Sequence, residues 1–210
     1  RQRVNEGALQ VRKLNDKLLE ASLAIESVMM PPKAFKTHIK QIKKAKKKES
    51  KNTDEQSPST RLFVCKFIGD IRASAVSNLR EEVTAILSVA NNVDQVAIIL
   101  ESGGGSIHGY GLAASQLQRF RAAGIHLTVI VDKIAASGGY MMACVANEII
   151  AAPFAVIGSI GVVGQLPNFH RLLEKHDIDF EQITAGKYKR TLSLFGRNTA
   201  ENRQKFQEEV

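Results

Sequence analysis

The stretch LTVIVDKIAASGGYMMA, residues 127–143, joins a strand pattern to a helix pattern through one serine and two glycines. Its first five residues are apolar and mostly β-branched, which predicts a buried strand. The small residues that follow Gly139 predict a helix. Ser137 therefore stands at a strand-to-helix junction, where the first N–H groups of a helix have no partner within it. Two roles fit this serine: a helix N-cap, or a nucleophile with oxyanion donors beside it.

Strand and helix patterns alternate outward from this junction, from Arg61 to the end of the chain. Strands are predicted at 62–67, 96–100, 126–131, 148–152, 156–160 and 180–184. Helices are predicted at 74–87, 107–123 (with Leu112, Leu117 and Phe120 facing inward), 169–175, and from an N-cap at Thr199 onward. Apolar strands separated by helices indicate an α/β fold with a mostly parallel, buried sheet.

The first thirty residues predict an amphipathic helix with a seven-residue apolar repeat. One repeat position holds Val4, Val11, Leu18 and Ile25, and the other holds Gly7, Leu14, Ala21 and Val28. Such a seam is typical of a coiled coil, and also of a helix that packs on its own domain through one apolar stripe. Pro31 and Pro32 end the helix.

The positive charge of the chain is confined to one segment. Residues 33–51 hold nine lysines and one glutamate, which equals the net charge of +8 of all 210 residues. The rest is neutral overall, which argues against a nucleic-acid-binding domain. The lysine run predicts a mobile tether, with contact to anionic lipid as the alternative. The predicted organisation is a helix at 1–32, a tether and linker at 33–60, and a C-terminally incomplete catalytic domain at 61–210.

The two cysteines lie inside apolar runs without metal-like spacing. We therefore expect Cys65 and Cys144 to be buried, inert thiols, with neither a disulfide nor a metal site. No run of eighteen apolar residues occurs in the chain, so no membrane-spanning helix is predicted within it.

A glycine-rich segment, SGGGS at residues 102–106, follows the strand predicted to end at Leu100. Glycines there allow a sharp turn and expose consecutive backbone N–H groups. A phosphate cradle is disfavoured because the pattern G-x-x-x-x-G-K-[ST] is absent. An oxyanion hole and a plain tight turn both fit.

A serine nucleophile needs a base. The α/β-hydrolase elbow would require glycine at position 135, which is Ala135 here. The segment TAGKYKR, residues 184–190, follows a predicted strand and offers Lys187 and Lys189. A lysine has a pKa near ~10.4, and burial lowers it by up to roughly 3–5 units, which permits a Ser–Lys pair. Spacing alone does not choose between the two lysines.

Three segments in this order carry a family resemblance. They are SGGG at 102–105, ASGGY at 136–140, and GSIGV at 158–162 followed by GKYK at 186–189. With them the chain resembles the signal peptide peptidase A family, from residue 62 to the end and more loosely in the N-terminal helix and lysine run. The resemblance implies a Clp-protease/crotonase-like spiral of ββα units. One departure is Gly103, where the family usually has proline.

The resemblance also implies site residues. Ser137 matches the nucleophile, and Lys189, in a Tyr-Lys dipeptide, matches the general base. Gly104 and Gly138 match the positions whose N–H groups face the oxyanion. Ser159 matches a hydroxyl that holds the lysine. No cofactor and no metal are implied.

The function implied by the resemblance is that of a membrane-associated serine endopeptidase that cleaves hydrophobic peptides such as signal-peptide remnants. It implies homo-oligomeric rings whose neighbours complete the sites. It also implies a single-pass protein of the bacterial inner membrane, with a periplasmic catalytic domain and an anchor preceding these residues. The lysine run alone favours the cytoplasmic face. The alternatives are a crotonase-like acyl-CoA enzyme, which would use the glycine loop for a thioester, and a non-catalytic membrane-tethered scaffold.

Overall fold

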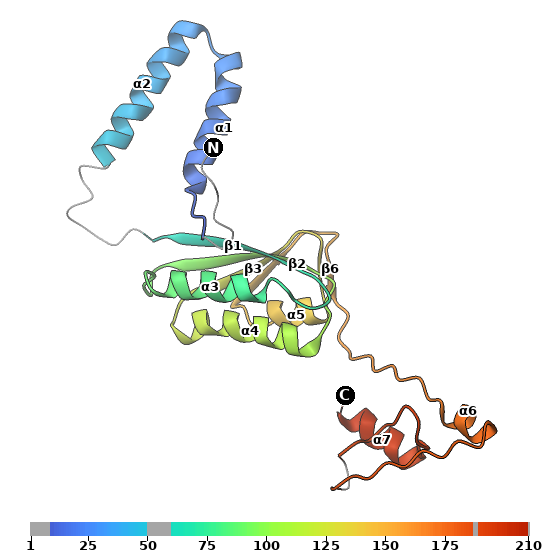
Figure 1. Cartoon of the computed structure of the whole chain (residues 1–210). Coiled ribbons are helices and arrows are strands. Elements are labelled where there is room, and N and C mark those ends of the chain that lie inside the picture. Colours follow the sequence, from blue (N-terminus) through green and yellow to red (C-terminus); the bar gives the residue numbers. More distant parts are fainter. Residues whose placement is uncertain (1–8, 50–59, 187–188, 210) are drawn as a thin grey trace. The chain divides into compact units, whose positions relative to one another are not determined.

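The computed structural model describes residues 9–49, 60–186 and 189–209 (Figure 1). The chain divides into two compact units, Arg1–Ile157 and Gly158–Val210, which are described separately below. Residues 50–59 of the tether and linker predicted at 33–60 lie outside the described residues.

A six-stranded sheet organises the first unit. In chain order its strands are β1 (Leu62–Gly69), β2 (Gln95–Ser102), β3 (His126–Val131), β4 (Ile134–Ala136), β5 (Glu148–Ala151) and β6 (Val156–Gly158). The central strand β2 pairs in parallel with β1 on one side and with β3 on the other. At its carboxyl end, β2 also pairs with β4 through Ser102 and Ala135. The parallel arrangement predicted from the sequence is confirmed.

Three helices lie against one face of this sheet, namely α3 (Val76–Leu87), α4 (Ile107–Ala122) and α5 (Gly138–Ala143) (Figure 1). Ser106 caps α4, because its side chain accepts a hydrogen bond from Gly109 N–H at 3.4 Å. Strands β3 and β4 followed by α5 form a ββα unit. The α/β fold class is thus confirmed. Because β1, β2 and β3 are parallel, their carboxyl ends lie at the same edge of the sheet.

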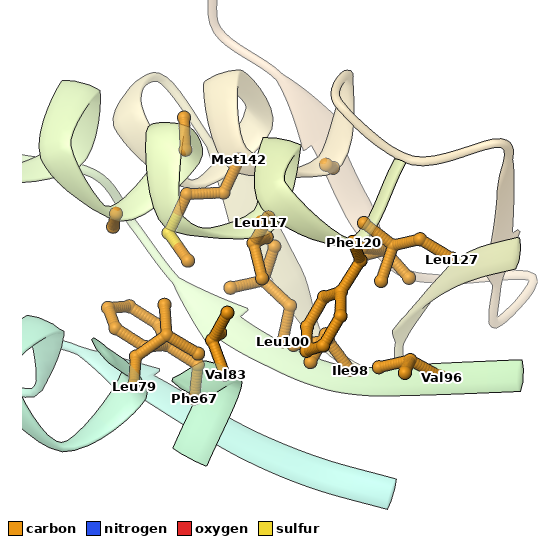
Figure 2. Close-up of a cluster of buried hydrophobic side chains, with 14 of the residues drawn as sticks. Phe67, Leu79, Val83, Val96, Ile98, Leu100, Leu117, Phe120, Leu127 and Met142 are labelled. Atoms are coloured by element: carbon orange, nitrogen blue, oxygen red, sulfur yellow. The ribbon is translucent and has the colours of Figure 1, made fainter. Parts of the chain in front are cut away.

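The hydrophobic core fills the space between this sheet face and the helices (Figure 2). Leu117 and Phe120 of α4 are fully buried, as predicted. The inward prediction for Leu112 is wrong, since 38% of this residue is exposed. The buried stripe of α4 runs through residues 110, 113, 114, 117 and 120. Leu112 lies outside that stripe. It precedes Leu117 by five residues, and this spacing places the two side chains on different faces of an α-helix.

We expect Leu117→Ala to lower the free energy of unfolding by about 2–5 kcal/mol, because it leaves a cavity in a filled core. Leu112→Ala, the matched change on the same helix, should cost about 1 kcal/mol or less. Denaturant unfolding followed by circular dichroism measures both. Equal losses in the two variants would contradict this account of the core.

The N-terminal residues form a helical hairpin of α1 (Leu14–Met29) and α2 (Pro32–Glu49). The lysine run is therefore helical over residues 33–49, a helix that the sequence analysis did not predict, and its role as a mobile tether stays a prediction. Phe35, Ile39 and Ile42 recur at helical spacing and are half-buried, while lysine and alanine favour helix. The ion pair Lys46–Asp16 at 2.8 Å joins the helices, and His38 Nε2 lies 3.1 Å from Glu26 Oε2.

The predicted apolar seam of the first helix is exposed where the structure describes it. The exposed members are Val11, Leu14, Leu18, Ile25 and Val28. Residues 9–13 are not helical, so the helix begins later than predicted, and residues 1–8 lie outside the described part. Two half-buried residues of α1, Leu19 and Leu23, lie on another face. Self-association through the seam stays a prediction.

The second unit contains α6 (His170–Lys175) and α7 (Ala200–Glu209). Thr199 caps α7 as predicted, since its hydroxyl accepts a hydrogen bond from Asn202 N–H at 3.2 Å. The predicted strand at 180–184 is wrong, because this segment pairs in no sheet. Phe180 instead packs on Phe195 with ring centroids 5.5 Å apart, in a small aromatic cluster.

Both cysteines are free, as expected. Cys65 of β1 is half-buried, and burial raises the pKa of its thiol to about 12. The burial expected for Cys144 is wrong: this residue is exposed because it is the C-cap of the short helix α5. Across residues 9–49, 60–186 and 189–209, no helix combines the length and apolar character needed to cross a bilayer.

Candidate active site

The candidate nucleophile, Ser137, occupies a strained turn between β4 and α5. Its backbone has φ of 50° and ψ of −115°, a conformation that residues other than glycine rarely adopt. Such strain costs of order 1–3 kcal/mol and is concentrated at functional sites. The Ser137 side chain makes no N-cap hydrogen bond to α5, so the helix does not use its hydroxyl. The N-cap role therefore finds no support. The residue is half-buried and directly follows β4.

The glycine loop after β2 packs directly on this turn. Gly104 has φ of 88°, and a Cβ placed on it would lie 2.7 Å from Ser137 Cβ and 2.8 Å from Gly138 N. Real side-chain atoms do not approach so closely, which means that only glycine fits here. The structure thus brings together three residues that the sequence analysis singles out: Gly104, Ser137 and Gly138.

The hydrogen bond of Gly104 is a feature that the sequence does not reveal. Gly104 N–H donates to Ser102 Oγ at 3.0 Å. The amide predicted to face an oxyanion therefore already has a partner inside the loop. Its role toward a substrate stays a prediction, as does that of Gly138, whose N–H begins α5.

The other two predicted residues, Ser159 and Lys189, belong to the second unit. Both are exposed within that unit. Ser159 has a strained φ of 51°, and the Lys189 backbone N–H donates to Gly186 O at 3.3 Å. Lys187 lies outside the described residues. The pairing of Lys189 with Ser137 accordingly stays a prediction.

Sequence reasoning missed Tyr110 of α4, which lies beneath the site. A Cβ on Gly138 would meet the Tyr110 ring, and one on Gly69 would meet its hydroxyl. Gly69 ends β1 and Gly138 begins α5, so these two glycines are far apart in the sequence and both come close to Tyr110 only in the folded structure. The available signal was a tyrosine in the first turn of the helix that the glycine loop opens.

We expect Gly104→Ala to lower the free energy of unfolding by about 1–3 kcal/mol or more, because alanine must adopt a positive φ and collide with Ser137. The control is Gly103→Ala in the same loop, where an added Cβ meets no atom within 4 Å. It should change stability by about 0.5 kcal/mol or less. Denaturant titration of the two variants decides, and equal effects would show that the close approach is absent.

Comparisons with known proteins show the family to which this chain belongs. Residues 1–117 match the family model "Peptidase family S49 N-terminal", and residues 119–210 match "Peptidase family S49". The chain belongs to peptidase family S49. Family membership makes the crotonase-like alternative unnecessary to explain the glycine loop.

Two bacterial relatives extend the assignment. The chain is 48% identical to the probable protease SohB of Haemophilus influenzae over 213 residues, which cover 97% of this chain and 60% of that protein. It is 65% identical to the probable protease SohB of Buchnera aphidicola over 150 residues, or 71% of this chain and 45% of that protein. The chain is thus similar to SohB-type members of the family. The chain spans about half the length of these curated relatives.

Solved structures with a related arrangement include a mutant of the 1510-N membrane-bound stomatin-specific protease in complex with a substrate peptide. It is 19% identical to this chain, covers 52% of it, or 49% of that protein's own chain, and aligns with a TM-score of 0.45. A ClpP1 mutant from Listeria monocytogenes is 18% identical, covers 41% of this chain and 46% of its own, and aligns with a TM-score of 0.30.

Proposed function

We propose that this S49 chain is part of a serine endopeptidase in which Ser137 is the nucleophile and Lys189 the general base. The observation that carries the proposal is the close approach of the glycine loop to Ser137. A Cβ built on Gly104 would lie 2.7 Å from Ser137 Cβ and 2.8 Å from Gly138 N, and the Ser137 hydroxyl makes no cap hydrogen bond to its own helix. A peptide carbonyl held there would meet a nucleophile and hydrogen-bond donors together.

In the first step, Ser137 Oγ attacks the carbonyl carbon of the scissile peptide bond while Lys189 Nζ accepts the hydroxyl proton. The carbonyl oxygen becomes an oxyanion. Gly138 N–H is the main donor that we assign to it. Gly104 N–H already donates to Ser102 Oγ, so it contributes as a shared donor. One donor at such a position is worth about 10²–10³ in kcat.

In the second step, the tetrahedral intermediate collapses and the peptide C–N bond breaks. The Lys189 ammonium returns its proton to the leaving amine, and Ser137 stays acylated. Water then attacks the acyl-enzyme with Lys189 again as base, which releases the second product and regenerates the hydroxyl. Lysine is protonated in water at neutral pH, so the proposal requires an assembled site that keeps water from the amine. Ser159 is the hydroxyl that we propose to hold this amine.

Hydrophobic peptides are the substrate class that we propose. The segment from Ile160 to Val163 lies outside any helix or strand of the second unit, and both of these residues are largely exposed. An extended peptide can pair with such a segment by β-augmentation, with apolar side chains on both partners. Association with anionic lipid through the lysines of α2, and assembly into a homo-oligomer, complete the proposal.

We expect Ser137→Ala and Lys189→Ala each to reduce hydrolysis of a hydrophobic fluorogenic peptide by at least about 10³-fold, since each removes one half of a catalytic pair. Lys187→Ala is the matched control and should keep most of the activity. The assay uses the whole protein with its native N-terminus. Full activity in Ser137→Ala would refute the nucleophile, and a loss confined to Lys187→Ala would move the base to that residue.

A further inference from the structure

Two buried hydroxyl groups lie directly beneath the candidate site. Ser102, the last residue of β2, is 2% exposed, and Tyr110 of α4 is fully buried. Their oxygens are 2.5 Å apart. Ser102 Oγ also accepts the hydrogen bond from Gly104 N–H at 3.0 Å, and Tyr110 Oη donates to the backbone oxygen of Asp70 at 2.7 Å. Four groups are therefore linked in one chain of hydrogen bonds.

The direction of this chain follows from the number of protons. The Asp70 carbonyl can only accept, so the single phenolic proton of Tyr110 goes to it. The proton between Ser102 and Tyr110 must then come from the Ser102 hydroxyl, which leaves a Ser102 lone pair for Gly104 N–H. Burial raises the pKa of Tyr110, which keeps the phenol protonated and able to donate. Each hydroxyl donates once and accepts once, an arrangement in which neighbouring bonds strengthen one another.

The same two residues also contact the other side of the site. The Tyr110 ring occupies the space that a side chain on Gly138 would need. Ser102 O would lie 2.7 Å from a Cβ on Gly139. Tyr110 and Ser102 thus hold the Gly104 turn by hydrogen bonds and support the first residues of α5 by packing. The loop is also fixed from outside, because Ser106 N–H donates to Ile71 O at 2.8 Å.

We propose that Ser102 and Tyr110 are positioning residues that fix the Gly104 and Gly138 amides around Ser137. The inference rests on the proposed function, because the amides matter only if an oxyanion forms there. Neither side chain is assigned a contact with substrate. Their loss should therefore leave substrate binding intact and misplace donors that act in the transition state, and a shift of 1 Å in such a group can cost 10²-fold.

The test compares Tyr110→Phe, Ser102→Ala and the double variant in the whole protein. Tyr110→Phe removes one oxygen and keeps the ring that supports Gly138. The control is Ser115→Ala on the same helix, an exposed serine whose hydroxyl donates to Leu112 O within its own turn. We expect each single variant to lower kcat about 10- to 100-fold with KM within about twofold of wild type. The double variant should be no worse than the more impaired single variant, because both changes break the same chain.

Three results would overturn the inference. They are an unchanged kcat in Tyr110→Phe, losses that multiply in the double variant, and losses explained by the unfolded fraction at the assay temperature, as measured by thermal unfolding. Ser137→Ala run beside these variants separates this inference from the proposed function. If Ser137→Ala is inactive while Tyr110→Phe and Ser102→Ala behave as wild type, only the positioning role fails. If Ser137→Ala is fully active, the proposed function fails as well.

Discussion

The close approach of the Gly104 backbone to Ser137 is the constraint on which this structure depends. Strand β2 ends at Ser102, where it pairs with Ala135 of β4, so the loop after β2 and the turn after β4 begin side by side. Both turns must then fit into the same space at the carboxyl edge of a parallel sheet, where sites of α/β proteins gather. The lack of a side chain at Gly104 lets them do so.

The core explains why these turns hold their strained shapes. Positive φ values at Ser137 and Gly104 persist only where the surroundings determine them more strongly than local preference does. Here the surroundings are a filled core under α4 and α5 (Figure 2) and the buried Ser102–Tyr110 hydrogen bond. The core and the proposed site therefore share residues at this edge, since the side chains that close the core are also those that touch the loops of the site.

Much of the first unit could be predicted because its strands carry strong local signals. Runs of mostly apolar residues indicated β1, β2 and β3, and helical spacing indicated α3 and α4. The three-residue β4 carries too short a signal, and it exists because Ala135 pairs with Ser102. The helix over the lysine run was not predicted, because its apolar stripe is weak and many of its residues are charged. The segment expected to be a strand at 180–184 instead packs Phe180 on Phe195.

Some residues of the candidate site could likewise be predicted from the sequence, and others could not. The order of three short motifs indicated Ser137, Gly104 and Lys189. The place of Tyr110 under Gly138 depends on a tertiary contact between α4 and α5, and the hydrogen bond from Gly104 to Ser102 depends on the exact shape of the loop, so the sequence pattern did not predict either contact.

The most direct measurement of the central claim is to map the residue modified when the active, whole protein reacts with a fluorophosphonate, by mass spectrometry of its proteolytic peptides. The account predicts a single stoichiometric adduct on the Ser137 hydroxyl, formed in step with the loss of peptide hydrolysis. Loss of activity with an adduct on another residue, or full hydrolysis by protein whose Ser137 is quantitatively modified, would contradict it.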